Sequence, residues 1–123
     1  MDVARDFAAE ANRRDLPVRL VAFVDEALAG TIVLRERAME ALPAYTPGLG
    51  GLFVAEPFRR RGVGTALIAA GMNLVRERGD GCVYAGTIAA RNLLKKSGWE
   101  LVGWKVIGPI PHEQEHLALY RWR

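Results

Sequence analysis

Cysteine is almost missing from this sequence, and its scarcity limits the chemistry available. Cys82 is the single cysteine among 123 residues, which excludes an internal disulfide and a metal site built from a cysteine cluster. No apolar run approaches the roughly 20 residues that a membrane helix requires. Residues 1–14 carry charges at short intervals and lack the apolar centre of a signal peptide. We therefore expect a cytoplasmic protein with no membrane partner and no metal.

A strong charge of one sign is also missing. The 17 Lys and Arg residues stand against 14 Asp and Glu residues, which gives a net charge of +3. This mild excess would suit an anionic nucleotide cofactor, but it is also ordinary for a soluble protein. A nucleic-acid-binding domain needs basic residues gathered on one face. The only dense cluster of basic residues is the triplet Arg59-Arg60-Arg61, which is too small to form such a face. We therefore expect no nucleic-acid partner.

The sequence shows no repeats, low-complexity tracts or long linkers, and its length predicts a single domain over residues 1–123. Residues 2–14 predict a short amphipathic helix, because Val3, Phe7 and Ala11 share one face. Hydrophobic periodicity and turn residues then predict further elements. In order, these are strands at 18–24 and 31–36, a loop at 37–48, a strand at 50–55, a helix at 62–78, a strand at 82–87, a helix at 88–97, and strands at 99–107 and 115–122.

The order of these elements predicts the sheet. A strand, a long helix and another strand in the middle imply a parallel pair with a right-handed crossover. Hairpins at both ends imply antiparallel neighbours, so the fold class is α/β of the α+β type with a mixed, mostly antiparallel sheet. In the long helix, Gly79 predicts the C-terminal end. Gly71 inside it either permits a close approach to the sheet or is incidental.

The segment 52–68, LFVAEPFRRRGVGTALI, carries the clearest chemical signal. It predicts a strand that ends, turns through arginines and glycines, and starts a helix. The first turn of a helix has unpaired N–H groups and the positive end of the helix dipole. Glycine lets an anion approach the backbone, and arginine supplies bidentate donors. Together these features predict a phosphate or pyrophosphate site.

Two common phosphate motifs do not fit this segment. A Walker loop needs a lysine after its last glycine, and none follows Gly64. A dinucleotide fingerprint needs a third glycine where Leu67 stands. The residues Arg59 to Gly64, RRRGVG, instead match the acetyl-CoA motif [RQ]-x-x-G-x-[GA] in full.

On this motif the chain resembles the GNAT acetyltransferases. A second likeness is Ser97-Gly98-Trp99, which ends a short helix as the family's K-x-G-[FW] segment does. Small bacterial members have a similar segment to Thr46–Leu49 before the motif strand. The resemblance covers residues 18–123. It implies the GNAT fold, with a splayed parallel strand pair that binds acetyl-CoA and helices on both faces of the sheet.

The resemblance also implies a function and a set of cofactor-binding residues. The function is transfer of an acetyl group from acetyl-CoA to a primary amine of a small molecule or peptide. Backbone groups of the strand would bind the acetyl carbonyl and pantetheine, the turn would hold the pyrophosphate, and residues 87–92 would flank the sulfur. The implied residues are Leu52, Phe53, Val54, Arg59, Arg60, Arg61, Gly62, Val63, Gly64, Thr65, Thr87 and Asn92, with the Leu52 N–H as the oxyanion donor.

The proton-handling residues of many relatives are missing. A lysine-like amine has a pKa of about 10.4, so reaching its neutral form at pH 7 costs about 4.6 kcal/mol. Many relatives have a glutamate where this chain has Gly48–Gly51, a tyrosine where it has Leu94, and an asparagine where it has Thr87. The catalytic residues are therefore unknown. The weak candidates are Glu56, His112, His116, Tyr45, Tyr84 and Tyr120.

These departures leave alternatives open. A non-catalytic acyl-CoA-binding module would keep the cofactor residues and lack the transfer reaction. We also expect that the first strand and helix usual in the family are missing before residues 2–14. Their loss would expose a sheet edge, so we expect a homodimer that covers this edge.

Overall fold

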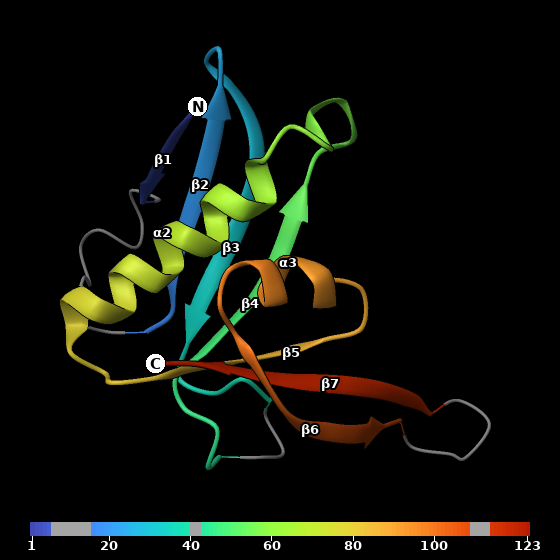
Figure 1. The fold of residues 1–123 in the computed structure, drawn as a ribbon. Helices are drawn as coiled ribbons and strands as arrows, with labels where there is room; N and C mark the ends of the chain where they lie inside the picture. Colours follow the sequence, from blue (N-terminus) through green and yellow to red (C-terminus); the bar gives the residue numbers. More distant parts are fainter. Residues whose placement is uncertain (6–15, 40–42, 109–113) are drawn as a thin grey trace.

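The computed structural model of the chain describes residues 1–5, 16–39, 43–108 and 114–123. These residues form a seven-stranded sheet in the order β1-β2-β3-β4-β5-β7-β6 (Figure 1). The strands are β1 (Asp2–Arg5), β2 (Val18–Val24), β3 (Ala27–Arg35), β4 (Gly48–Val54), β5 (Val83–Thr87), β6 (Glu100–Ile107) and β7 (Glu115–Trp122). A 3-10 helix, η1 (Glu56–Phe58), and the helices α2 (Val63–Arg78) and α3 (Arg91–Lys96) complete the described elements.

The central strands β4 and β5 are parallel, and every other neighbouring pair of strands is antiparallel. The register pairs β4 with β5 at one position, Gly48 with Tyr84. Beyond it the two strands diverge toward their C-terminal ends (Figure 1). The predicted mixed sheet with a splayed parallel pair is therefore confirmed.

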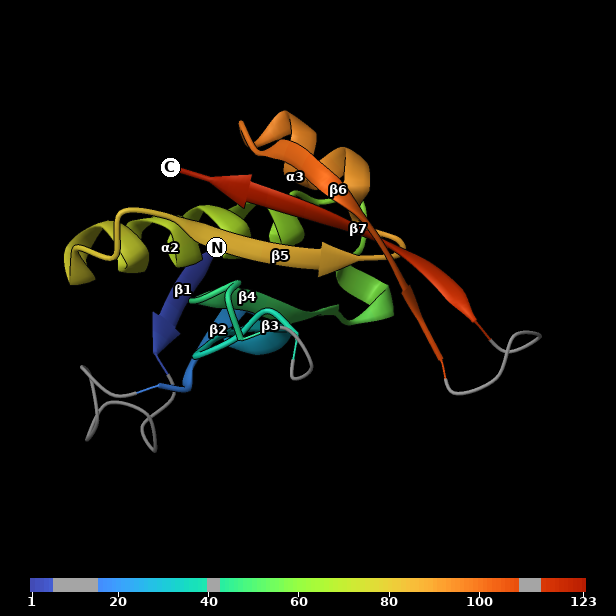
Figure 2. The same ribbon diagram turned by 90° about the horizontal axis from the view of Figure 1, so that it is seen from below.

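Helix α2 packs its apolar stripe on β2, β3 and β4. Val63, Leu67, Ile68 and Val75 are buried in this interface, as the periodicity predicts. Helix α3 lies on the same side of the sheet and contacts α2 (Figure 2). None of the described helices has both the length and the apolar character of a membrane span.

Gly71 faces Leu49 of β4 at close range. A Cβ atom on Gly71 would lie 2.7 Å from the Leu49 Cδ1 atom, closer than real side chains approach. The close-approach interpretation of this glycine is therefore confirmed, and the middle of α2 rests directly on the first half of β4.

Trp99 fixes the end of α3. Gly98 has a φ of 89°, which ends the helix in the left-handed conformation. The Trp99 backbone N–H then donates to the Leu94 oxygen at 3.0 Å. Its indole N–H reaches the Met72 sulfur on α2 at 3.4 Å, and the side chain is buried. This contact holds α3 against α2.

The N-terminal prediction is wrong where the structure describes it. Residues 2–5 form strand β1 and not the start of a helix, and β1 pairs antiparallel with β2 from Asp2–Phe23 to Arg5–Leu20. Pairing with β2 overrides the weak helical periodicity of so short a segment. The remainder of the predicted helix, residues 6–15, lies outside the described residues.

The same strand corrects the expectation that the first strand of the fold is missing. Strand β1 occupies the position next to β2, so it covers the edge on which we expected a second copy to pair. The edge of β2 is therefore not free to pair with a second copy of the chain. Homodimerisation itself stays a prediction.

Strand β4 begins at Gly48, within the predicted loop 37–48, because it already pairs there with Arg35 of β3. Strand β3 and helix α3 begin at residues other than those predicted, for local reasons. Strand β3 begins at Ala27 because Asp25 and Glu26 make a tight hairpin turn with φ values of 49° and 69°. Helix α3 begins at Arg91 and not at residue 88. The Ala90 N–H donates to the Thr87 hydroxyl at 2.7 Å, which holds residues 87–90 in a turn before the helix.

Candidate active site

The turn between β4 and α2 is held in place by Arg59. Its Nε atom donates to the Val54 oxygen at 3.1 Å, which ties the turn back to the end of β4. The turn contains two left-handed residues, Arg60 with φ 63° and Gly62 with φ 80°. Alternating handedness in a short turn directs successive backbone N–H groups toward the same side, a geometry that binds anions.

Helix α2 begins without a side-chain cap. Gly62 is its N-cap residue and has no side chain with which to cap the free N–H groups of the first turn. The first helical bond comes from the Ala66 N–H to the Gly62 oxygen at 3.0 Å. A Cβ atom on Gly62 would meet nothing within 4 Å, so the space beyond it is open. This helix end can therefore accept an anion from solvent.

An open cavity of about 650 Å³ lies over this turn. Its lining joins the end of β4, the turn, the first residues of α2 and the segment before α3. The lining residues are Leu52, Phe53, Val54, Phe58, Arg59, Arg60, Gly62, Val63, Gly64, Thr65, Ala89, Ala90 and Leu93.

A second cavity, of about 400 Å³, lies where β4 and β5 diverge. Its lining residues are Ile32, Leu49, Gly50, Gly51, Leu52, Ile68, Ala85, Gly86, Thr87, Ile88, Ala89, Ala90, Leu94 and Leu117. Leu52, Ala89 and Ala90 line both cavities, so the two meet beside β4. We refer to the larger cavity as the turn cavity and to the smaller one as the strand cavity.

Strand β4 has a bulge at the strand cavity. Its register with β3 passes from Val33–Gly50 to Thr31–Phe53. Ile32 thus stands opposite both Gly51 and Leu52, and neither of these two is paired with β3 or β5. The bulge frees the backbone at Leu52 from the regular ladder at the point where the two cavities meet.

The structure brings most of the implied cofactor residues together. Leu52 to Val54, Arg59, Arg60 and Gly62 to Thr65 line the turn cavity, and Thr87 lines the strand cavity. Two residues stand apart, since neither Arg61 nor Asn92 lines either cavity. The Arg61 guanidinium lies over the Phe58 ring at 5.7 Å, and Asn92 is exposed on α3.

Several lining residues cannot be recognised from the sequence. Phe58, Leu93, Ile68 and Leu117 are apolar residues from four separate elements. Their sequence signal is core periodicity, which does not distinguish a cavity wall from the packed interior. The three-dimensional contact between elements is what places them at the site.

Among the described residues, no ionisable side chain lines the strand cavity. Leu94, at the position where the resemblance implies a tyrosine, is buried. The Thr87 hydroxyl is the one polar side chain in the lining, and it already accepts the Ala90 N–H. The strand cavity, where the resemblance implies the acetyl group would lie and which we call the acyl end of the site, is therefore apolar. The turn cavity, which we call the turn end, is lined by two arginines.

The candidate acids and bases lie elsewhere. Glu56 and His116 are exposed, Tyr120 is buried in the core, and Tyr45 stacks on Tyr84 with ring centroids 5.3 Å apart. None of these five lines either cavity. His112 lies outside the described residues.

Comparison with known proteins agrees with this geometry. Residues 2–99 match the model of the "Acetyltransferase (GNAT) family". A match over this much of the chain shows the family, so the protein belongs to the GNAT acetyltransferases, which use acetyl-CoA as the acetyl donor. No curated protein sequence matches the chain.

Solved structures share the fold at low identity. The GNAT acetyltransferase from Streptococcus pneumoniae is 15% identical with a TM-score of 0.70, and the match covers 94% of this chain and 71% of that one. The yncA protein from Salmonella typhimurium, solved with its cofactor acetyl-CoA, is 17% identical with a TM-score of 0.73 and coverage of 93% and 68%. The IAA acetyltransferase from Bacillus cereus is 14% identical with a TM-score of 0.70 and coverage of 98% and 97%.

These structural neighbours differ in length. The chain spans 97% of the Bacillus cereus protein but 61% of a streptothricin acetyltransferase from Bacillus anthracis. At these identities the likeness shows the fold alone. The choice of acceptor must therefore come from this chain's own residues.

Proposed function

We propose that the protein transfers an acetyl group from acetyl-CoA to a primary amine of a small molecule or peptide. The main support for this proposal is that the two cavities of the site are continuous. An anion-binding turn at the start of α2 opens into a cavity that meets an apolar cavity between β4 and β5. Such a site would hold a long ligand with a charged end and a thin, uncharged arm.

The residues of this chain fit acetyl-CoA along that path. The N–H groups of residues 62–65 and the guanidinium groups of Arg59 and Arg60 would bind the phosphates. Leu52, Val54 and Ala90 would border the pantetheine arm. Arg61, which lies over Phe58 and lines neither cavity, is left out of this assignment.

When bound, acetyl-CoA supplies the thioester. In the transfer, the amine nitrogen would form a bond to the acetyl carbon as the C–S bond breaks, and the nitrogen would give up its proton to the departing thiolate, so that CoA leaves as the thiol. The Leu52 N–H, beside the bulge, would donate to the acetyl oxygen as it becomes negative. The apolar wall formed by Ile32, Leu94 and Leu117 would exclude water from the thioester and limit its hydrolysis.

The strand cavity supplies no base among its described lining residues, so the amine must arrive neutral. Deprotonation would then take place in solvent before the attack, and the rate would depend on the amine's own pKa. The same observation favours a second candidate, a non-catalytic acyl-CoA-binding module. Both candidates require acetyl-CoA to bind at the turn.

Two measurements separate these candidates. Calorimetry with acetyl-CoA tests the binding that both require. A panel of primary amines, with free thiol measured over time, tests the transfer. Thiol release that needs both acetyl-CoA and an amine supports the transferase. Tight binding of acetyl-CoA without thiol release for any amine up to pH 9 would contradict the transferase and support the non-catalytic binding module.

A further inference from the structure

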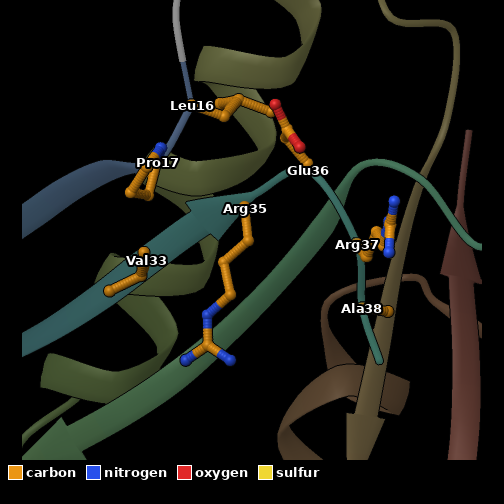
Figure 3. A pocket seen from close by; sticks show the side chains of 7 residues that line it. All are labelled: Leu16, Pro17, Val33, Arg35, Glu36, Arg37 and Ala38. Carbon is orange, nitrogen blue, oxygen red and sulfur yellow. The ribbon is translucent and has the colours of Figure 1, made fainter. Parts of the chain in front are cut away.

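A third cavity lies on the face of the sheet opposite α2. Along β3, Ile32 and Leu34 are buried toward α2, so Val33 and Arg35 face the other side. This cavity of about 610 Å³ is lined by Leu16, Pro17, Val33, Arg35, Glu36, Arg37 and Ala38 (Figure 3). We refer to it as the rear cavity.

Arg35 reaches from the rear cavity across β4. Figure 3 shows its side chain extending over the neighbouring strand and away from Leu16 and Pro17. A Cβ atom on Gly50 would lie 3.7 Å from the Arg35 Cζ atom, and one on Gly51 would lie 2.8 Å from its Nη2 atom. The guanidinium thus covers the side-chain-free backbone of Gly50 and Gly51.

These two glycines also line the strand cavity. Arg35 therefore lies against one side of the β4 backbone, and the proposed acyl end of the site lies against the other. At Gly50 and Gly51 no side chain separates them. A molecule that approaches the acyl end from the rear face would meet this guanidinium first.

The Arg35 side chain is exposed, and within the described part of the chain its guanidinium has no carboxylate partner. The nearest acidic residue in sequence, Glu36, points its carboxylate away from the guanidinium (Figure 3). Arg37 adds a second positive charge to the same cavity.

We propose that Arg35 binds an anionic group, a carboxylate or a phosphate, on the molecule whose amine is acetylated. This inference rests on the proposed function and names its substrate class. At Gly50 and Gly51 the backbone beside the acyl end is covered by a cation. A cation there cannot take a proton from the amine, but its planar fork matches the two oxygens of a carboxylate or phosphate. Acceptors that carry only further positive charge meet like charge at Arg35 and Arg37.

The test uses three primary amines of equal chain length that end in a carboxylate, a phosphate or a carboxamide. Their binding to the full chain saturated with CoA is measured by calorimetry, which does not require turnover. We expect at least one anionic amine to bind about tenfold or more tightly than the carboxamide. The tighter of the two anions identifies the group. Equal binding of all three amines would overturn the inference.

Substitutions then assign the effect to Arg35. Arg35→Met should remove the preference for the anionic amine, and Arg35→Lys should retain part of it. Lys96→Met is the control, because Lys96 is exposed on α3 and lines none of the three cavities. Thermal melting checks that each variant folds. A preference that persists in folded Arg35→Met contradicts the proposal.

Two further measurements keep the outcomes distinct. Glu36→Gln removes a negative charge from the rear cavity and should tighten binding of the anionic amine about twofold, which provides a test if Arg35→Met does not fold. Acetyl-CoA affinity should be unchanged in all four variants. If the anionic amine binds through Arg35 but no thiol is released, the recognition stands and the transferase proposal fails. If thiol is released equally from anionic and carboxamide amines, the transferase stands and the recognition fails.

Discussion

The turn end and the acyl end of the proposed site are built on opposite principles. At the turn end, Arg59, Arg60 and the start of α2 present charge and free N–H groups to an open cavity. At the acyl end, the described lining between β4 and β5 is apolar apart from Thr87. The turn end can hold a ligand by electrostatics. The acyl end can contribute only its shape, the exclusion of water and the unpaired backbone at the bulge of β4.

The contrast separates binding from chemistry. Anion binding by backbone needs a particular chain conformation, which both Arg60 and Gly62 adopt and which glycine adopts without steric cost. Proton transfer needs an ionisable group within reach, and the described lining of the strand cavity has none. A substitution at the turn should therefore act on affinity, and a change at the acyl end should act on rate or on folding.

The largest effect is expected at Gly62. A valine there would project into the open space over the helix start, so Gly62→Val should lower acetyl-CoA affinity more than about 100-fold, as measured by calorimetry. Gly79→Val is the matched control. Both glycines have φ near 80° and nothing within 4 Å of the position that a Cβ atom would take, so both substitutions should cost about 1–2 kcal/mol of stability. Equal affinities for acetyl-CoA in the two variants would show that the turn is not part of the binding site.

The pH dependence of the rate tests the acyl end. With no base in the described lining of the strand cavity, kcat/KM should rise about tenfold per pH unit up to the pKa of the free amine. Two acceptors with amine pKa values near 8 and near 10 should then give two different apparent pKa values. A common apparent pKa for both acceptors would show that a group of the protein acts as the base and would contradict the apolar acyl end.

The arginines of the turn should differ among themselves. Arg59 and Arg60 line the turn cavity, whereas Arg61 stacks over Phe58. Arg60→Met should weaken acetyl-CoA binding about fivefold, because it removes one exposed charge–phosphate contact. Arg59→Met should weaken it at least as much, because it also removes the bond that ties the turn to the Val54 oxygen. Arg61→Met should change the affinity less than twofold. A larger loss at Arg61 than at the other two would reverse the assignment of the phosphate ligands.

The turn end was predictable from sequence because its structure is local. The run Arg59 to Gly64 determines its own backbone conformation and the helix that follows, so a motif of six residues predicts both. The strand cavity was less predictable, since Ile32, Ile68 and Leu117 meet there through the fold and carry ordinary core periodicity.

The errors have the same physical origin. Strand β1 is four residues long and depends on pairing with β2, so its own sequence did not predict it. Arg35 carries no sequence signal of its own, because a single exposed arginine at a strand end is commonplace. Its position over Gly50 and Gly51 depends on the register between β3 and β4, which sequence periodicity does not define.

The smallest effect concerns how the helix supports the acyl end. Gly71 of α2 lies against Leu49, which lines the strand cavity. Gly71→Ala gains about 1 kcal/mol of helix propensity but forces a Cβ to within 2.7 Å of the Leu49 Cδ1 atom and 2.8 Å of its Cδ2 atom. Overpacking of this kind costs about 1–3 kcal/mol, so we expect a net loss of about 1 kcal/mol in urea unfolding.

Leu49→Val in the Gly71→Ala background separates the two terms. The shorter side chain relieves the contact, so the double variant should be more stable than the sum of the two single changes predicts. If the two changes were additive, Leu49 would not be the side chain that Gly71 accommodates. The affinity for acetyl-CoA should change less than twofold in Gly71→Ala, because the turn end does not depend on this contact. A loss of affinity equal to that of Gly62→Val would mean that the two ends of the site act as one unit and not as separate parts.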